Sequence, residues 1–118
     1  MWLACNTAVV ERPLTRRERE VLEALLSVEF DGVEELRAQA PSATVVGECG
    51  CGCPSIDFTK ERGTGMRIRV NAAIQGTHDG LFLFMLGGKL GGIEYVGVSP
   101  EGDPQELPDP SALVIEAV

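Results

Sequence analysis

The chain has 118 residues, of which 44% are hydrophobic and 24% are charged, and its formal net charge is −8. This length and composition are typical of one soluble globular domain with an ordinary core. No apolar run is long enough to span a membrane, and an acidic chain lacks the basic footprint on which nucleic-acid binding depends. We therefore expect a single domain that binds neither membranes nor nucleic acid.

The N-terminal residues 1–13 predict an arm and not a targeting signal. They have no basic start and no long apolar core, so we expect a disordered arm or a short strand there. Without a signal peptide the cytoplasm is the expected location, where cysteines are normally reduced. We expect one folded α+β domain over residues 14–118.

Two helices are predicted at the start of this domain. Thr15 and Glu18 have the spacing of a capping box, in which two residues satisfy backbone amides at the start of a helix. A second, shorter helix is expected to begin at Asp31 and to end before Pro41, because proline disfavours a helical residue ahead of it. The first helix has apolar residues at helical spacing: Val21, Leu22, Leu25 and Leu26.

After Pro41 the hydrophobic pattern has a period of two, which predicts strands. Ile68 and Val70 are expected to face the core, while Arg69 between them faces solvent. Leu81–Leu86 is apolar on both faces, so its second face needs a cover, either a partner subunit or the C-terminal segment. The predicted strands cover four segments: Thr44–Phe58, Arg67–Gln75, Leu81–Leu86 and Ile93–Val98.

The order of these elements indicates an α+β fold. We predict two N-terminal helices packed on an antiparallel β-meander of about four strands. The C-terminal part, residues 90–118, carries no lysine or arginine, and this acidic end predicts either a solvated edge or a surface for a basic protein partner. Its acids are Glu94, Glu101, Asp103, Glu106, Asp109 and Glu116.

The most informative motif is the alternating run Cys49–Cys53, with the sequence CGCGC, which Pro54 ends. In a straight strand, residues two apart lie on one face about 6.8 Å apart, too far for sulfurs that share one zinc ion. The two glycines tolerate a bulge or kink, and a bent run could gather its thiolates.

Three interpretations of Cys49, Cys51 and Cys53 stay open. They could be packed, inert thiols, since cysteine is among the most buried residue types. They could bind zinc or copper, although no second CxxC pair and no histidine pair supports a metal site. They could also form a redox site, which requires exposed thiolates of lowered pKa. If the thiols are packed, we expect another segment to approach Gly50 and Gly52 closely.

Other polar residues do not form a recognisable catalytic set. His78, the one histidine, lies in a glycine-bounded turn, and a Cys–His pair would require it to meet Cys53 in space. Glu48 and Asp57 flank the cysteines; they could tune a thiolate, but we expect them to pair with Arg67 or Arg69 across the sheet. The segment Gly63–Gly65 and Ser55 lack the contexts of a phosphate loop and of a nucleophile elbow.

Two resemblances bear on this sequence. Leu14–Leu22 resembles the opening helix of LuxR-type helix-turn-helix domains, but the position of their recognition helix is glycine-rich and almost without bases here. The chain from Leu14 onward also resembles a group of small bacterial proteins whose activity is uncharacterised. The shared motifs are an LTxxExxVLxxLL helix at Leu14–Leu26, a CGCP element at Cys51–Pro54 and an LPDP segment at Leu107–Pro110.

From the sequence we therefore expect a non-enzymatic protein-interaction or structural domain that forms a homodimer. The alternative is a metal-binding or redox site at Cys49, Cys51 and Cys53. The first interpretation involves no cofactor, and the resemblance implies no activity for any residue.

Overall fold

The computed structural model describes residues 7–50, 52–60, 65–98 and 102–118. Its strands form one seven-stranded sheet in the order β1-β2-β3-β6-β5-β4-β7, and every pairing is antiparallel. The helical elements are α1 (Arg16–Leu25), α2 (Val33–Gln39) and the short 3-10 turns η2 (Ala40–Ser42) and η3 (Pro110–Ala112). The strands are β1 (Thr7–Pro13), β2 (Thr44–Cys49), β3 (Ile56–Asp57), β4 (Met66–Ile74), β5 (Gly80–Leu86), β6 (Lys89–Val96) and β7 (Leu113–Ala117).

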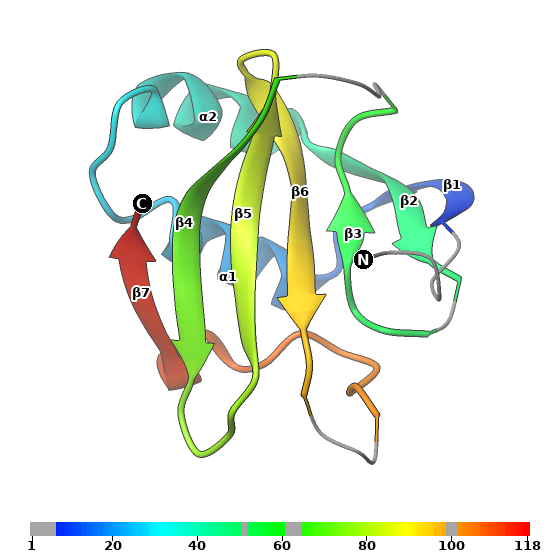
Figure 1. The fold of residues 1–118 in the computed structure, drawn as a ribbon. Coiled ribbons are helices and arrows are strands. Elements are labelled where there is room, and N and C mark those ends of the chain that lie inside the picture. The colour runs from blue at the N-terminus through cyan, green and yellow to red at the C-terminus, as the bar shows by residue number, and fades with distance from the viewer. Residues whose placement is uncertain (1–6, 51, 61–64, 99–101) are drawn as a thin grey trace.

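The predicted fold class is wrong, because the sheet has seven strands where a meander of about four was expected. The N-terminal arm contributes β1, which pairs with β2. The long strand expected over Thr44–Phe58 is divided into β2 and β3 by a turn at the cysteine run, and the C-terminal segment adds β7 beside β4. The helices are short and cover one face of this sheet (Figure 1).

Helix α1 begins as the capping box predicts. The Thr15 hydroxyl accepts a hydrogen bond from the Glu18 amide at 3.1 Å, and the Glu18 carboxylate accepts one from the Thr15 amide at 2.8 Å. The apolar side of α1 then packs with α2 against the inner face of the sheet, where burying each large aliphatic side chain contributes about 1.5–3 kcal/mol. The fully buried residues include Leu22, Leu25, Leu36, Val45, Leu83 and Ile93.

A bulge in β4 changes which residues face the core. Val70 is opposite Leu83, as expected for an inward residue, but the pairing of β4 with β5 shifts between Ile68 and Val70. Ile68 is therefore opposite Phe84 and is 38% exposed, so its predicted place in the core is wrong. Arg69, the extra residue of the bulge, lies with its guanidinium 5.2 Å from the centre of the Phe30 ring, a distance typical of a cation–π contact.

The short strand β3 depends on two glycines of β6. Asp57 is opposite Gly92, and the amide of Phe58 donates to the carbonyl of Gly91 at 2.8 Å. A Cβ on Gly92 would lie 2.5 Å from the carbonyl oxygen of Ile56 and 2.9 Å from the Phe84 ring. Only glycine lets the strand and the ring approach this closely.

Candidate functional site

The cysteine run forms a turn and not a straight strand. Strand β2 ends at Cys49, whose carbonyl accepts a hydrogen bond from the Gly52 amide at 3.2 Å. Gly52 has a φ of +95°, a left-handed conformation that L-residues rarely adopt. No described atom lies within 4 Å of where a Cβ on Gly52 would be, so the close approach expected at this glycine is absent from the described part of the chain.

The cysteines of the run do not share one chemical state. Cys49 is disulfide-bonded, whereas Cys53 keeps its thiol, so the expectation of reduced cysteines is wrong at Cys49. Cys51 lies outside the described residues. Within the described ranges, no group of three or more histidine, cysteine, aspartate or glutamate residues is arranged to hold a metal ion. A metal site that includes Cys51 stays a prediction.

Cys49 and Cys53 line the same cleft, which has a volume of about 440 Å³. We call it the cysteine cleft. Other walls of the cleft come from the start of α1 and from the segment before η3. Arg17 of α1 donates to the Leu107 carbonyl at 3.0 Å and so fixes this segment against the helix. The remaining lining residues are Arg12, Thr15, Glu18, Glu48, Gly52, Pro54, Ser55, Ile56, Gln105, Glu106 and Leu107.

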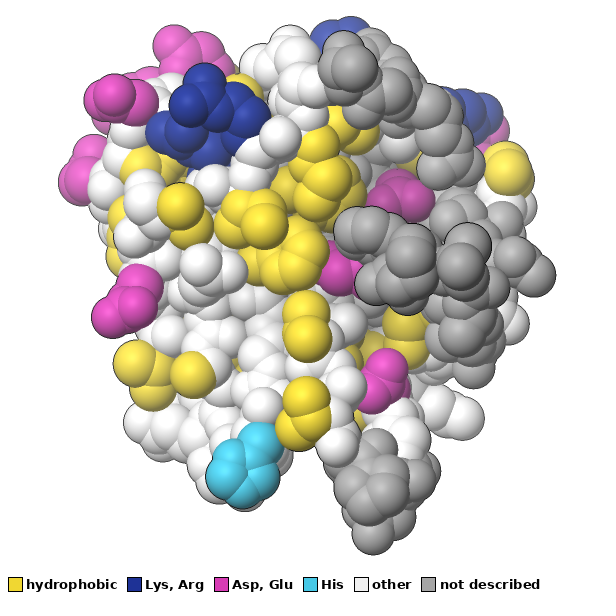
Figure 2. Space-filling model, viewed as in Figure 1, with side chains coloured by type: hydrophobic (Ala, Val, Ile, Leu, Met, Phe, Trp, Pro, Cys, Tyr) yellow, Lys and Arg dark blue, Asp and Glu magenta, His cyan; other side chains and the backbone are white. Residues whose placement is uncertain are grey.

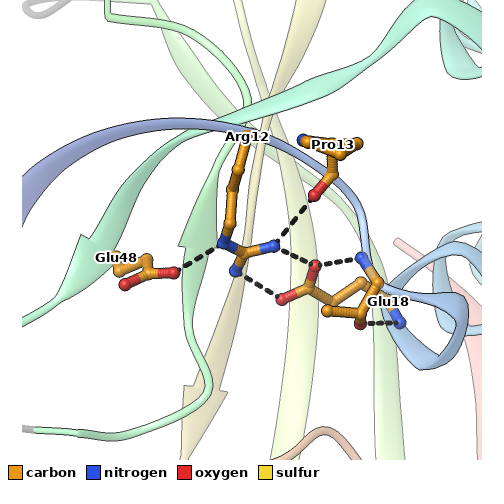
Figure 3. A network of polar contacts seen from close by, with 5 residues as sticks. Arg12, Pro13, Glu18 and Glu48 are labelled. Carbon is orange, nitrogen blue, oxygen red and sulfur yellow. Dashed lines mark hydrogen bonds and ion pairs between the residues drawn. The ribbon is translucent and has the colours of Figure 1, made fainter.

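Arg12 joins three elements at the edge of this cleft (Figure 3). Its guanidinium makes two hydrogen bonds of 2.9 Å to the two carboxylate oxygens of Glu18, a bidentate geometry, and a bond of 2.7 Å to Glu48 on β2. It also donates to the Pro13 carbonyl at 3.0 Å. All three nitrogens of the guanidinium are therefore occupied within the chain, and Arg12 has little capacity left for an anionic ligand.

The ionisation of Glu18 follows from these contacts. Burial by itself raises the pKa of Glu18, but the hydrogen bonds from Arg12 and from the Thr15 amide outweigh it, and the pKa lies below its usual range. The hydrogen bond to Glu18 raises the pKa of Arg12 in turn. Both groups stay charged at neutral pH, so the pair holds β1 and α1 together and does not exchange protons.

A second cavity of about 620 Å³ lies beside the β4–β5 hairpin. The Tyr95 hydroxyl donates to Asp79 at 2.5 Å, and the Val98 amide donates to the other carboxylate oxygen at 2.9 Å. Burial and this bond raise the pKa of Tyr95, and the bond from Tyr95 lowers the pKa of Asp79. His78 lines this cavity and not the cysteine cleft, so the structure does not bring His78 and Cys53 to one site.

The sequence analysis predicted neither the contacts of Arg12 with Glu18 and Glu48 nor the bond between Tyr95 and Asp79. We expected Glu48 to pair with Arg67 or Arg69. It pairs instead with Arg12, across β1 and β2. The one available signal was Glu18, whose capping role was visible in the sequence while its ion pair was not. The Gly63–Gly65 segment lies partly outside the described residues, and Ser55 donates to Glu94 at 3.4 Å and accepts from the Tyr95 amide at 2.9 Å.

The sheet face opposite the helices is apolar at its centre (Figure 2). The strand register places a set of large side chains on this outer face, and the rings of Phe82 and Phe84 lie 6.2 Å apart there. Met66 is 40% exposed and Ile68 is 38% exposed. We call this set the outer face; it consists of Met66, Ile68, Phe82, Phe84 and Val96.

Comparisons of the whole chain with known proteins add no family. No family model matches it, and no curated protein and no solved structure matches it. Among the described residues, no helix is long and apolar enough to cross a membrane. The resemblance to small bacterial proteins therefore stays a prediction, and the case for a function depends on the geometry of the cleft and of the outer face.

Proposed function

We propose that this protein is a non-enzymatic interaction module whose outer face binds a partner protein that carries both apolar and basic side chains. The observation that carries this proposal is the cluster of large apolar side chains on the sheet face that none of the described helices covers. Contiguous exposed apolar patches are uncommon on monomeric proteins and typically mark interaction sites.

The arrangement of the outer face supports binding. The Phe84 ring lies against Gly91 and Gly92 and is 8% exposed, and Ile68 stands opposite it on β4. Rigid aromatic and aliphatic side chains at the centre of a face lose little conformational freedom when a partner covers them. The face therefore has the features of an interface centre.

The charge of the chain supports a basic partner. The net charge is −8, and residues 90–118, which follow Lys89 at the start of β6 and include all of β7, contribute six acids and no lysine or arginine. Glu94 lies on β6 opposite Phe82, and Glu116 lies on β7 opposite Asn71, so carboxylates lie next to the apolar centre. A partner with lysine or arginine around an apolar core would match this pattern and associate faster at low salt.

Affinity capture with a matched pair of variants tests this proposal. Met66→Ser combined with Ile68→Ser removes apolar area from the outer face, while Val9→Ser, at a residue that is 74% exposed on β1, removes it elsewhere. We expect a protein with a basic surface to be retained by the wild type and by Val9→Ser, lost from the double variant and released by salt. Equal retention by all three proteins would contradict the proposal.

A thiol–disulfide centre is the second candidate, and one observation favours it. The disulfide-bonded Cys49 and the thiol of Cys53 line the same cleft. In the cytoplasm, where we place this protein, disulfides are typically transient and serve redox chemistry. The Cys53 thiolate would attack the disulfide, a new sulfur–sulfur bond would form to Cys53, and the departing sulfur would take up the proton.

Thiol counting separates this candidate from inert packing. We expect mass spectrometry of the native protein after brief alkylation to find label on Cys53, and Cys53→Ser to block movement of the disulfide to new positions. Cys53→Ala serves as the second variant, since both changes remove the thiol but only serine adds a hydroxyl. No labelling of Cys53 in the folded protein and one fixed disulfide in all variants would count against exchange.

A further inference from the structure

We infer that the outer edge of β7 is a dimer interface, at which β7 pairs antiparallel with β7 of a second copy of this chain. Among the described strands, β7 has β4 as its one neighbour and lies at the end of the sheet (Figure 1). The inference goes beyond the proposed function, since it concerns the sheet edge and not the outer face.

The two edges of the sheet differ in how they are protected. Strand β1 contains a bulge between Val9 and Arg12, ends in Pro13 and carries the charged side chain of Arg12. Bulges, prolines and charges are the usual devices that prevent an edge strand from pairing with another chain. Strand β7, with the sequence LVIEA, has no proline, lysine or bulge and forms a regular ladder with β4.

The hydrogen bonds at the two ends of β7 define which backbone groups point outward. Gln75 donates to the Ala112 carbonyl at 2.8 Å, and Val118 donates to the Arg69 carbonyl at 2.9 Å. Since the bonding pattern of an antiparallel strand alternates, the even-numbered residues between them bond to β4. The odd-numbered residues direct their amides and carbonyls toward the open edge; they are Leu113, Ile115 and Ala117.

These outward groups are self-complementary. In an antiparallel pair of β7 strands with a two-fold axis at Ile115, Leu113 of one copy is opposite Ala117 of the other, and both point their backbone groups at each other. The same register places Glu116 opposite Val114 of the second copy. The two Glu116 carboxylates are therefore not directly opposite, and no like charges repel across the axis.

The side chains across this axis favour a second copy over a basic peptide. Val114 is 48% exposed, and pairing would cover it with the aliphatic part of Glu116. Within one copy, Val114 is opposite Ala73 and Glu116 is opposite Asn71, both neutral residues. A change of charge at position 114 or 116 therefore acts mainly on the dimer and not on the fold of the subunit.

Charge substitution at these positions tests both the interface and its register. We expect the wild type to show a concentration-dependent dimer by sedimentation equilibrium. Val114→Glu should raise the dimer dissociation constant about threefold to thirtyfold, because it places like charges opposite each other in two symmetry-related pairs. Val114→Lys should lower the dimer dissociation constant by a similar factor. Adding Glu116→Lys to Val114→Glu should return the dissociation constant to near the wild-type value. Ala117→Pro removes an outward amide and should give a monomer.

Circular dichroism and thermal melting of each variant confirm that the subunit remains folded. A wild type that is monomeric at the highest accessible concentration would overturn the inference. A dimer whose dissociation constant changes in the same direction for Val114→Glu and Val114→Lys would also overturn it, because such a dimer would use another surface. A monomer that instead binds an extended peptide at this edge would replace the second copy with a different occupant and refute the homodimer.

Discussion

Glu18 offers the sharpest test of how the N-terminal arm is fixed. Its side chain is 11% exposed and accepts two hydrogen bonds from Arg12 and one from the Thr15 amide. Glu18→Gln keeps one carbonyl oxygen for the Thr15 amide and for one Arg12 nitrogen, but it turns an amide donor toward the other nitrogen. Because one charge-assisted bond is lost, we expect a cost of about 1.5–3 kcal/mol in the free energy of unfolding.

Urea unfolding with a matched control measures this cost. Glu20→Gln removes a carboxylate of the same helix that is 40% exposed and pairs with Arg16 at 3.3 Å, and we expect it to cost less than about 0.5 kcal/mol. The two variants should differ in the midpoint of unfolding with an unchanged slope. Equal midpoints for Glu18→Gln and Glu20→Gln would refute the argument that the Arg12–Glu18 pair stabilises the fold.

The pH dependence gives a second test of the same pair. The folded pKa of Glu18 lies below its unfolded value, so its stabilisation is complete above the unfolded pKa and is lost as the pH falls through the folded pKa. Protonated Glu18 resembles glutamine in shape and charge. The difference in stability between the wild type and Glu18→Gln should therefore be constant near neutral pH and disappear in acid, and a difference that persists in acid would point to packing instead.

Two further predictions follow from close contacts. Gly92→Ala should destabilise the protein by about 1–3 kcal/mol in urea unfolding, because the new Cβ would meet the Ile56 carbonyl and the Phe84 ring; an unchanged midpoint would show that β3 can move away. Tyr95 is the one tyrosine, so ultraviolet titration reports its ionisation alone. Burial and the bond to Asp79 raise the pKa of Tyr95, so it should ionise above the usual value of about 10, and Asp79→Asn should lower this pKa.

Local patterns predicted the elements that depend on neighbours in sequence. The capping box identified the start of α1 because its two hydrogen bonds join Thr15 and Glu18, three residues apart. Alternating apolar residues predicted β4, and a continuous apolar run predicted β5, each within one residue of its observed bounds; β6 begins at Lys89, before the expected start at Ile93. In these elements the side chains that pack also define the period, so sequence and structure agree.

The rest depends on pairing between distant segments. Strand β3 has two residues, too few to show a period, and exists because β2 and β6 lie on either side of it. The bulge at Arg69 leaves no trace in the alternation of the sequence, yet it moves Ile68 from the expected core to the outer face. Arg12 and Glu48 are 36 residues apart, and their bond depends on the pairing of β1 with β2.

Each pKa shift among the described polar groups moves away from neutral pH. A general acid or base is most effective when its pKa lies near the working pH. Here the pKa values of Glu18 and Asp79 are lowered and that of Tyr95 is raised, so each moves away from neutrality. The partners that cause these shifts also fix β1 to α1 and the β4–β5 hairpin to the end of β6. These polar groups therefore join elements at the margins of the sheet, away from the outer face and the β7 edge on which the two proposals depend.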